Sequence, residues 1–128
     1  MSELRVLVVE DNDKNLKLIR DVLEFAGFNV VTADTAEIGV RLAIEDPPAI
    51  VLMDLQLPGM DGTQALGELR ASPRTTHVPV VAVTAYAMDE DRERVLSAGF
   101  DGYITKPLNI RALPAQIRDY LPPEGNQS

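Results

Sequence analysis

The stretch Ile50-Val51-Leu52-Met53-Asp54-Leu55-Gln56-Leu57-Pro58-Gly59 decides the fold. Its four leading apolar residues indicate a strand buried on both faces, which is typical of a parallel sheet that helices cover on either side. The Pro58-Gly59 pair predicts a sharp turn soon after the strand. Asp54 therefore stands where a buried strand ends, and a carboxylate exposed at that point indicates a functional role.

Short apolar runs of the same kind alternate with segments of helical periodicity along the chain. The predicted strands are Leu4 to Val9, Asn29 to Ala33, Ile50 to Met53, Val80 to Val83 and Gly102 to Thr105. Strands that alternate with helices predict a parallel sheet joined by right-handed crossovers. The sequence therefore predicts a flavodoxin-like, doubly wound (βα)5 α/β fold whose five-stranded parallel sheet has the order 2-1-3-4-5.

Glycines, prolines and capping residues predict the ends of the helices. Gly27 ends the first helix as a left-handed cap. Asp34 caps the second helix while Glu37 reaches back to it, and Pro47-Pro48 stops that helix. The remaining helices are predicted from Asp61-Gly62 to about Ala71, from Ala87 to Ala98 before Gly99, and up to about Leu121 with Pro114 in the first turn.

Length and composition limit the kind of protein. The 128 residues predict one domain over residues 1–122 and a short disordered tail over 123–128. With 20 acidic and 12 basic residues the net charge is −8, which argues against direct binding of nucleic acid. The absence of cysteine excludes disulfides and thiolate metal sites. No run is apolar enough for a signal peptide or a membrane span, so we expect a cytoplasmic protein.

Acidic residues follow two strands that are neighbours in the predicted sheet. In a doubly wound sheet, ligands bind at the carboxyl ends of the strands near the first and third strands. Glu10 and Asp11 follow the first of these strands and Asp54 ends the other. Three carboxylates at close range repel one another and require a cation, and hard oxygen ligands suit Mg²⁺. The sequence predicts a magnesium site at Glu10, Asp11, one Asp54 oxygen and the Gln56 carbonyl.

Two further strand ends carry groups suited to phosphoryl transfer, a reaction that needs positioning and charge neutralisation. Lys106 supplies a cation, Thr84 supplies a hydroxyl, and the second Asp54 oxygen is left to attack phosphorus. Taken singly, each residue has a structural alternative: a helix cap for Asp11 or Asp13, a turn acid, a capping threonine, a surface lysine. Their common place at the strand ends favours a shared site.

Four motifs in this order resemble the receiver domain of two-component response regulators, over residues 3 to 121. They are Val9-Glu10-Asp11-Asn12, Met53-Asp54-Leu55-Gln56-Leu57-Pro58-Gly59-Met60-Asp61-Gly62, Thr84-Ala85 and Gly102-Tyr103-Ile104-Thr105-Lys106-Pro107. The resemblance implies that Asp54 accepts a phosphoryl group from a sensor histidine kinase or a histidine phosphotransfer protein, with Mg²⁺ required. It also implies that Lys106 pairs with the phosphoryl group and that the Lys106–Pro107 bond is cis.

The resemblance further implies a switch. Thr84 moves toward the phosphoryl group, Tyr103 fills the space, and the face made by the fourth helix, fifth strand and fifth helix changes its protein partners. Gln56 and Tyr86 would tune the lifetime of the acyl phosphate, with Tyr86 shielding it. Because little chain follows Leu121, the chain resembles the stand-alone, DivK-like type, as a monomer or a weak phosphorylation-dependent dimer.

Other classes of protein fit the same residues less well. A flavin carrier is disfavoured because Glu10-Asp11-Asn12-Asp13 repels phosphate in the absence of a metal. A phosphohydrolase usually has a second acid where Gln56 stands. Two alternatives stay open: a scaffold that is not phosphorylated, and a receiver fragment of a hybrid histidine kinase. The preferred function is a phosphoacceptor switch, not an enzyme, which assists its own phosphorylation and autodephosphorylation.

Overall fold

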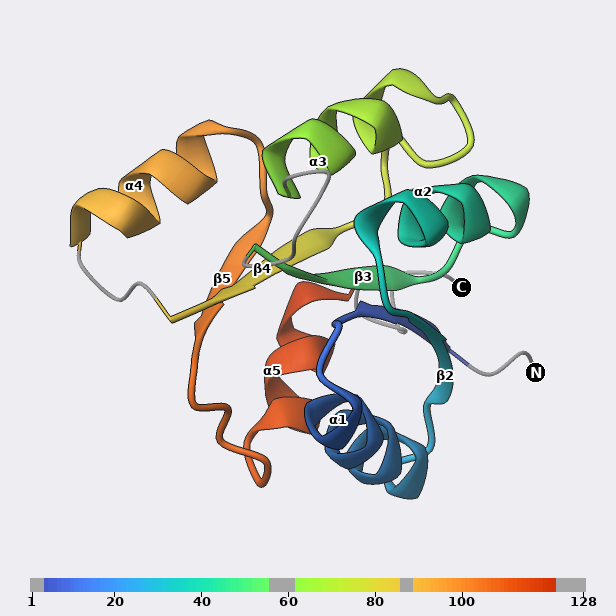
Figure 1. Ribbon diagram of the computed structural model, residues 1–128, viewed down its shortest axis with the longest axis vertical. Coiled ribbons are helices and arrows are strands. Elements are labelled where there is room, and N and C mark those ends of the chain that lie inside the picture. The colour runs from blue at the N-terminus through green and yellow to red at the C-terminus, as the bar shows by residue number, and fades with distance from the viewer. Residues whose placement is uncertain (1–3, 56–61, 86–88, 122–128) are drawn as a thin grey trace.

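The structure is a computed structural model that describes residues 4–55, 62–85 and 89–121 (Figure 1). Its sheet is parallel, with the strand order β2-β1-β3-β4-β5, which confirms the predicted topology. The strands are β1 (Arg5–Val9), β2 (Asn29–Ala33), β3 (Ile50–Asp54), β4 (Val80–Thr84) and β5 (Gly102–Thr105). The helices are α1 (Asp13–Phe25), α2 (Ala36–Glu45), α3 (Gly62–Ala71), α4 (Asp89–Ser97) and α5 (Leu113–Tyr120).

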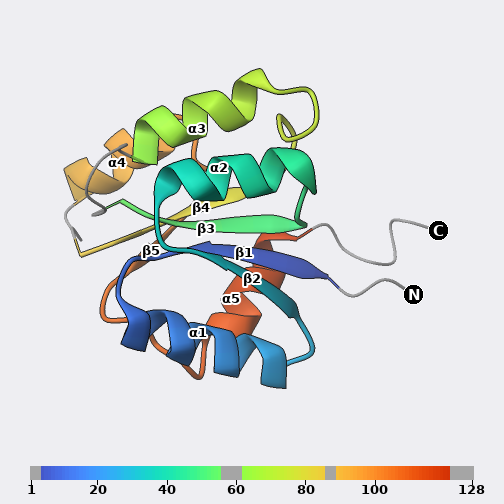
Figure 2. The same cartoon turned by 45° about the vertical axis from the view of Figure 1, so that its right-hand side comes forward.

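Helices cover both faces of the sheet, with α1 and α5 on one side and α2, α3 and α4 on the other (Figures 1 and 2). Alternate residues of each strand therefore enter two separate cores. Leu7, Val51 and Ala82 belong to the core under α2 and α3. Leu52 and Val81 belong to the core under α1 and α5. None of the described helices is long and apolar enough to cross a membrane.

The register of the strands brings their carboxyl ends to one edge of the sheet. Val9 lies opposite Met53, so the residues that follow Val9 come level with Asp54, the last residue of β3. At the other side of the sheet Thr84 lies opposite Thr105. Lys106 directly follows Thr105, and the edge therefore collects groups from four strands.

The first helix ends as the sequence predicts. Gly27 has a φ of 100°, in the left-handed region that glycine adopts without a steric penalty. The Phe28 N–H donates to the Leu23 carbonyl at 3.0 Å, and the Gly27 N–H donates to the Glu24 carbonyl at 3.0 Å. These two bonds form a Schellman cap. Gly99 has a φ of 111° after α4, and Pro114 lies in the first turn of α5, both as predicted.

The prediction that Asp34 caps the second helix is wrong by one residue. The cap is Thr35, whose Oγ1 accepts a hydrogen bond from the Ile38 N–H at 3.1 Å. Thr35 has extended backbone angles, so the chain leaves β2 with one more residue outside the helix. Asp34 is exposed, and Glu37 lies in the first turn, where its charge favours the positive end of the helix dipole. Two adjacent cap-forming residues made the choice ambiguous in the sequence.

Candidate functional site

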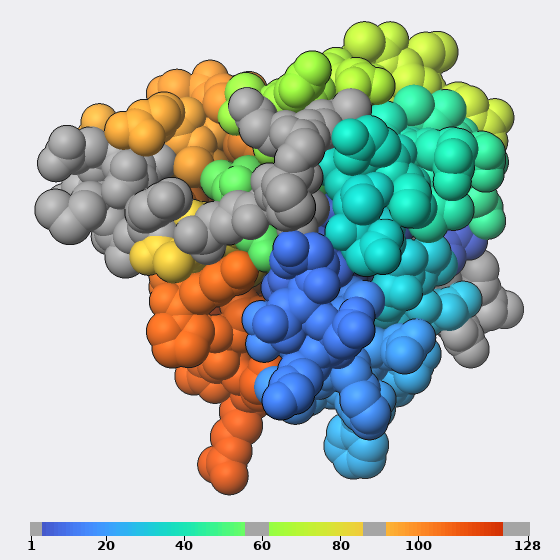
Figure 3. Space-filling model, in the orientation of Figure 1, coloured from blue at the N-terminus to red at the C-terminus, as the bar shows by residue number. Residues whose placement is uncertain are grey.

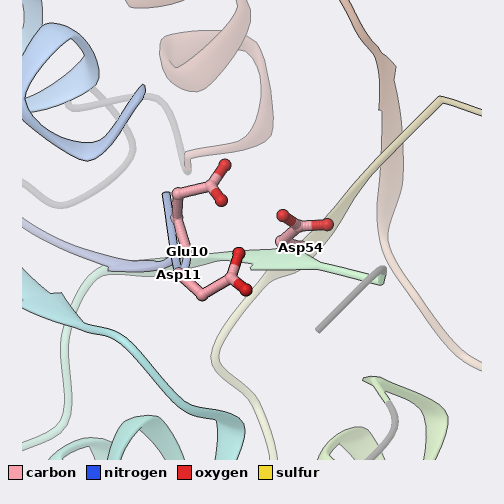
Figure 4. Close-up of side chains that lie close together, drawn as sticks. All are labelled: Glu10, Asp11 and Asp54. Atoms are coloured by element: carbon pink, nitrogen blue, oxygen red, sulfur yellow. The ribbon is translucent and has the colours of Figure 1, made fainter. Parts of the chain in front are cut away.

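Three carboxylates meet at the carboxyl edge of the sheet (Figure 4). One ligand oxygen from each of Glu10, Asp11 and Asp54 lies within 4.8 Å of the others. Glu10 and Asp54 are buried, each with about 3% of its surface exposed, whereas Asp11 is exposed. The cluster therefore has a dry side within the sheet and a side open to water, which suits a cation that keeps part of its hydration shell.

Asn12 shapes the acidic cluster, in a role that was not predicted from the sequence. Its Oδ1 accepts from the Asn15 N–H at 3.0 Å and so caps α1. Its own N–H donates to Glu10 Oε2 at 3.1 Å. The alternative in which Asp11 or Asp13 caps the first helix is therefore wrong. Because Asn12 provides the cap, the Asp11 carboxylate is not used by the helix. A signal was present: asparagine is among the preferred N-cap residues.

Lys106 enters the cluster from β5. Its Nζ donates to Asp54 Oδ2 at 2.8 Å and lies 3.9 Å from Glu10 Oε1. The Lys106 N–H donates to the Thr84 carbonyl at 2.8 Å and joins the ends of β4 and β5. The Lys106–Pro107 bond is cis, as predicted. The lysine side chain is 23% exposed, so the alternative of a solvated surface lysine does not describe it.

The pKa of Glu10 is raised, mainly because the carboxyl is buried. Burial raises the pKa of this carboxyl above its ordinary value of 4.5; the Asn12 N–H opposes the rise, the negative Asp54 adds to it, and Lys106 lowers it. Between 4.5 and the raised pKa, the folded protein binds more protons than the unfolded chain. Folding stability therefore falls as the pH rises through that interval. Three carboxylates beside one lysine leave an excess of negative charge, which fits a divalent cation.

Thr84 and Tyr103, the two residues of the predicted switch, lie on the adjacent strands β4 and β5. Thr84 is buried at the end of β4, with about 1% of its surface exposed. Tyr103 lies opposite Ala82, so it is on the face of the sheet that α3 and α4 cover. The Tyr103 hydroxyl is buried and has no hydrogen-bond partner in the described part of the chain. Gln56 and Tyr86, which were predicted to flank the phosphoryl group, lie outside the described residues.

A pocket of about 240 Å³ opens next to the cluster, between α1 and the segment that leads into α5. Figure 3 shows these two parts of the chain, in blue and orange, side by side on the surface. The lining of the pocket is mainly apolar, with the charged Glu10 and Lys106 of the site at one side. The lining residues are Glu10, Asn15, Leu18, Ile19, Lys106, Pro107, Leu108 and Ile110. The sequence analysis missed this pocket. No sequence pattern marked it, because the 48% exposure of Leu18, a large apolar side chain in its lining, is known only from the structure.

The fold and the site define a class of protein: an α/β domain with a buried aspartate that a lysine holds beside two further acids. Comparison with known proteins agrees with this class. Residues 6–118 match the family model described as the response regulator receiver domain. The chain belongs to the response regulator receiver domain family.

Individual relatives support the assignment. The polar-differentiation response regulator DivK of Brucella ovis is 38% identical over 116 residues, which cover 91% of this chain and 94% of that protein. The receiver domain of a sensor histidine kinase from Pseudomonas aeruginosa, solved with a magnesium ion in its active-site cleft, has a TM-score of 0.84. It is 34% identical, and the match covers 93% of this chain and 98% of that one.

A third protein is similar to this chain in its fold alone. The chemotaxis protein CheY4 of Vibrio cholerae has a TM-score of 0.88 at 22% identity, with 94% of this chain and 100% of that chain covered. Membership of the family has general consequences. Receiver domains act as phosphoacceptor switches in two-component signalling, bind Mg²⁺ at an acidic pocket, and interact with histidine kinases and phosphotransfer proteins.

Proposed function

We propose that this chain is a single-domain response regulator in which Asp54 accepts a phosphoryl group from a histidine kinase or a histidine phosphotransfer protein. The observation that carries the proposal is the 2.8 Å bond from Lys106 Nζ to Oδ2 of a buried aspartate at a strand end. A buried carboxylate held in this way is positioned for reaction, and the same lysine is in place to meet the charge that the phosphoryl group adds.

The reaction uses few groups. An Asp54 oxygen attacks the phosphorus of a phosphohistidine, a P–O bond forms, and the P–N bond breaks with its electron pair passing to the imidazole nitrogen. Lys106 then pairs with an oxygen of the phosphoryl group. Glu10 and Asp11 would hold Mg²⁺ together with the second Asp54 oxygen and the Gln56 carbonyl. The bound ion would supply charge neutralisation for the phosphoryl oxygens.

The switch follows from the added charge. A phosphoryl group on Asp54 brings nearly two negative charges and acceptor oxygens close to the Thr84 hydroxyl, which can donate to one of them. Movement of Thr84 opens space beside Tyr103, whose position on the neighbouring strand lets it respond. The face formed by α4, β5 and α5 would then change its downstream protein partners. We place this activity in the cytoplasm, with the chain as a monomer or a weak phosphorylation-dependent dimer.

Intact mass measurement tests the proposal. Purified parent, Asp54→Asn and Asp34→Asn are incubated with Mg²⁺ and acetyl phosphate. Asp34 is the matched control because it is an exposed aspartate that follows strand β2, which β1 separates from β3. The expected result is a gain of one phosphoryl group in the parent and in Asp34→Asn, with no gain in Asp54→Asn. An unmodified parent would instead support a scaffold that is not phosphorylated.

A further inference from the structure

The two helices beside β5 are anchored to different degrees. In α5, Leu113 and Ile117 are completely buried. The Tyr120 ring of α5 packs on Gly102 of β5, so closely that a Cβ atom on Gly102 would overlap it. Arg118 donates to the Ala26 carbonyl at 3.1 Å, which ties α5 to the end of α1. These contacts hold α5 against β5 and against the end of α1.

Among the described side chains, fewer hold α4. Among its residues 92–97, whose side chains the structure describes, Val95 is the one that packs against the hydrophobic core, and it is only partly buried. The other five are exposed, including Leu96 at 40%. A helix with little buried apolar surface belongs to the less stable parts of a domain and moves at low free-energy cost.

The carboxyl end of α4 is nevertheless held firmly, by Arg70 of α3. Its Nη2 donates to the Gly99 carbonyl at 3.2 Å and to Asp101 Oδ2 at 2.6 Å, while Nη1 donates to the Val78 carbonyl at 2.7 Å. Asp101 Oδ2 also accepts from the Val80 N–H at 2.8 Å. We call Arg70, Gly99 and Asp101 the Arg70 clamp. The clamp fixes the chain that follows α4 to α3 and to the start of β4.

We propose that the Arg70 clamp is a pivot: α4 swings about its carboxyl end, and its amino end carries the displacement that phosphorylation of Asp54 produces. This rests on the proposed function for the trigger. The amino end of α4 follows β4, which ends at Thr84 beside Asp54, whereas the clamp lies where β4 and β5 begin. Nine residues of helix span about 13 Å, so a rotation of about 10° moves the amino end by about 2 Å.

The buried hydroxyl of Tyr103 favours the swing of α4. Its hydroxyl is buried without a hydrogen-bond partner in the described residues, on the face of β5 that α4 covers. A buried hydroxyl that lacks a partner destabilises the arrangement that buries it. Displacement of the amino half of α4 would let water reach this hydroxyl while the Arg70 clamp stays closed.

Spin-label distances test the pivot, and because the chain has no cysteine of its own, labels attach only at the introduced positions. Arg20→Cys on α1 serves as the reference and is paired with either Arg92→Cys or Ala98→Cys, all three at exposed positions. On phosphorylation with acetyl phosphate and Mg²⁺, we expect the distance between the labels at positions 20 and 92 to shift by about 1–2 Å, or its distribution to broaden. This shift is slightly less than that of the amino end, because position 92 lies closer to the pivot. The distance to position 98 should keep its parent distribution. Equal changes at both positions would overturn the pivot.

Opening the clamp supplies a test that does not depend on phosphorylation. In unphosphorylated protein, Arg70→Ala should broaden the distance distribution at position 98, because α4 loses its fixed end. Arg74→Ala is the matched control: this arginine donates to the Ile44 and Glu45 carbonyls at the end of α2 and does not form part of the clamp. Asp101→Asn, which keeps the shape of the side chain, serves if Arg70→Ala does not fold.

The outcomes separate the two proposals. An unchanged distribution at position 98 in folded clamp variants contradicts the pivot, whatever happens at Asp54. Intact mass measured on each labelled sample reports phosphorylation independently. Failure of the parent to gain a phosphoryl group would contradict the proposed function while leaving the comparison of unphosphorylated clamp variants as the test of the pivot.

Discussion

Replacement of Lys106 by methionine should destabilise the metal-free protein because it removes the cation from three clustered carboxylates. Lys106 Nζ lies 2.8 Å from Asp54 Oδ2 and 3.9 Å from Glu10 Oε1. At an effective dielectric constant of about 20, these separations correspond to attractions of about 6 and about 4 kcal/mol. Desolvation of the lysine offsets much of this, and loss of one partner from a buried pair costs about 3–5 kcal/mol in practice.

The assay is urea unfolding at neutral pH, with and without Mg²⁺. We expect Lys106→Met to lower the free energy of unfolding by about 3 kcal/mol without Mg²⁺. Mg²⁺ should then stabilise the variant more than the parent, because the ion neutralises the same carboxylates that the lysine served. Lys106→Arg, which keeps the positive charge, should fall between the two.

Lys17→Met is the matched control for this experiment. Lys17 forms an ion pair with Asp21 at 3.0 Å, almost the same separation, but both side chains are more than half exposed. Water screens such a pair, so its loss should cost less than about 1 kcal/mol. Two results together would refute the reasoning that the three carboxylates carry more negative charge than Lys106 neutralises. They are a loss of unfolding free energy in Lys106→Met no larger than in Lys17→Met, and equal stabilisation of Lys106→Met and the parent by Mg²⁺.

Of three further substitutions, two should raise the free energy of unfolding and one should lower it, all measurable by chemical denaturation. Glu10→Gln should raise the stability of the metal-free protein at neutral pH, because burial penalises the charged form of Glu10 and so raises its pKa. The gain should shrink as the pH falls toward 4.5, where Glu10 becomes protonated. A gain independent of pH would argue against burial of the charge as its cause. Gly27→Ala should lower the free energy of unfolding by about 1 kcal/mol, since a φ of 100° strains alanine. Gly67→Ala should raise it by about 0.5–1 kcal/mol, because a Cβ added at this exposed position of α3 meets nothing within 4 Å beyond the adjoining residues of its own helix. The same sign at both glycines would contradict the assignment of their backbone conformations.

Much of the fold was predictable from local pattern. The strands are nearly continuous apolar runs, which predicted that helices cover both faces of the sheet. In the structure β3 and β4 are buried at every position, as this prediction requires. The end of the first helix was also predictable, because glycine at position 27 favours the left-handed conformation found there. The cap of α2 was not, since Asp34 and Thr35 are both good cap residues and the difference lies in one backbone conformation.

The candidate site was predictable as a set of residues at strand ends but not as a set of contacts. Sheet order brings Glu10, Asp11 and Asp54 together, because parallel strands end at a common edge. The bond from Lys106 to Asp54 and the role of Asn12 depend on side-chain conformations that only packing determines. The Arg70 clamp joins three separate segments, so nothing in the local sequence pointed to it.

The central claim is that Asp54 is the residue that receives the phosphoryl group, in a reaction that depends on Mg²⁺. Borohydride reduces an aspartyl phosphate to homoserine, so peptide mass mapping after reduction identifies the modified position. With acetyl phosphate and Mg²⁺ the account predicts homoserine at position 54 and aspartate at positions 11 and 34, with the conversion lost when a chelator removes the metal. Homoserine at another aspartate, or conversion at position 54 that is equal with and without Mg²⁺, would contradict the account.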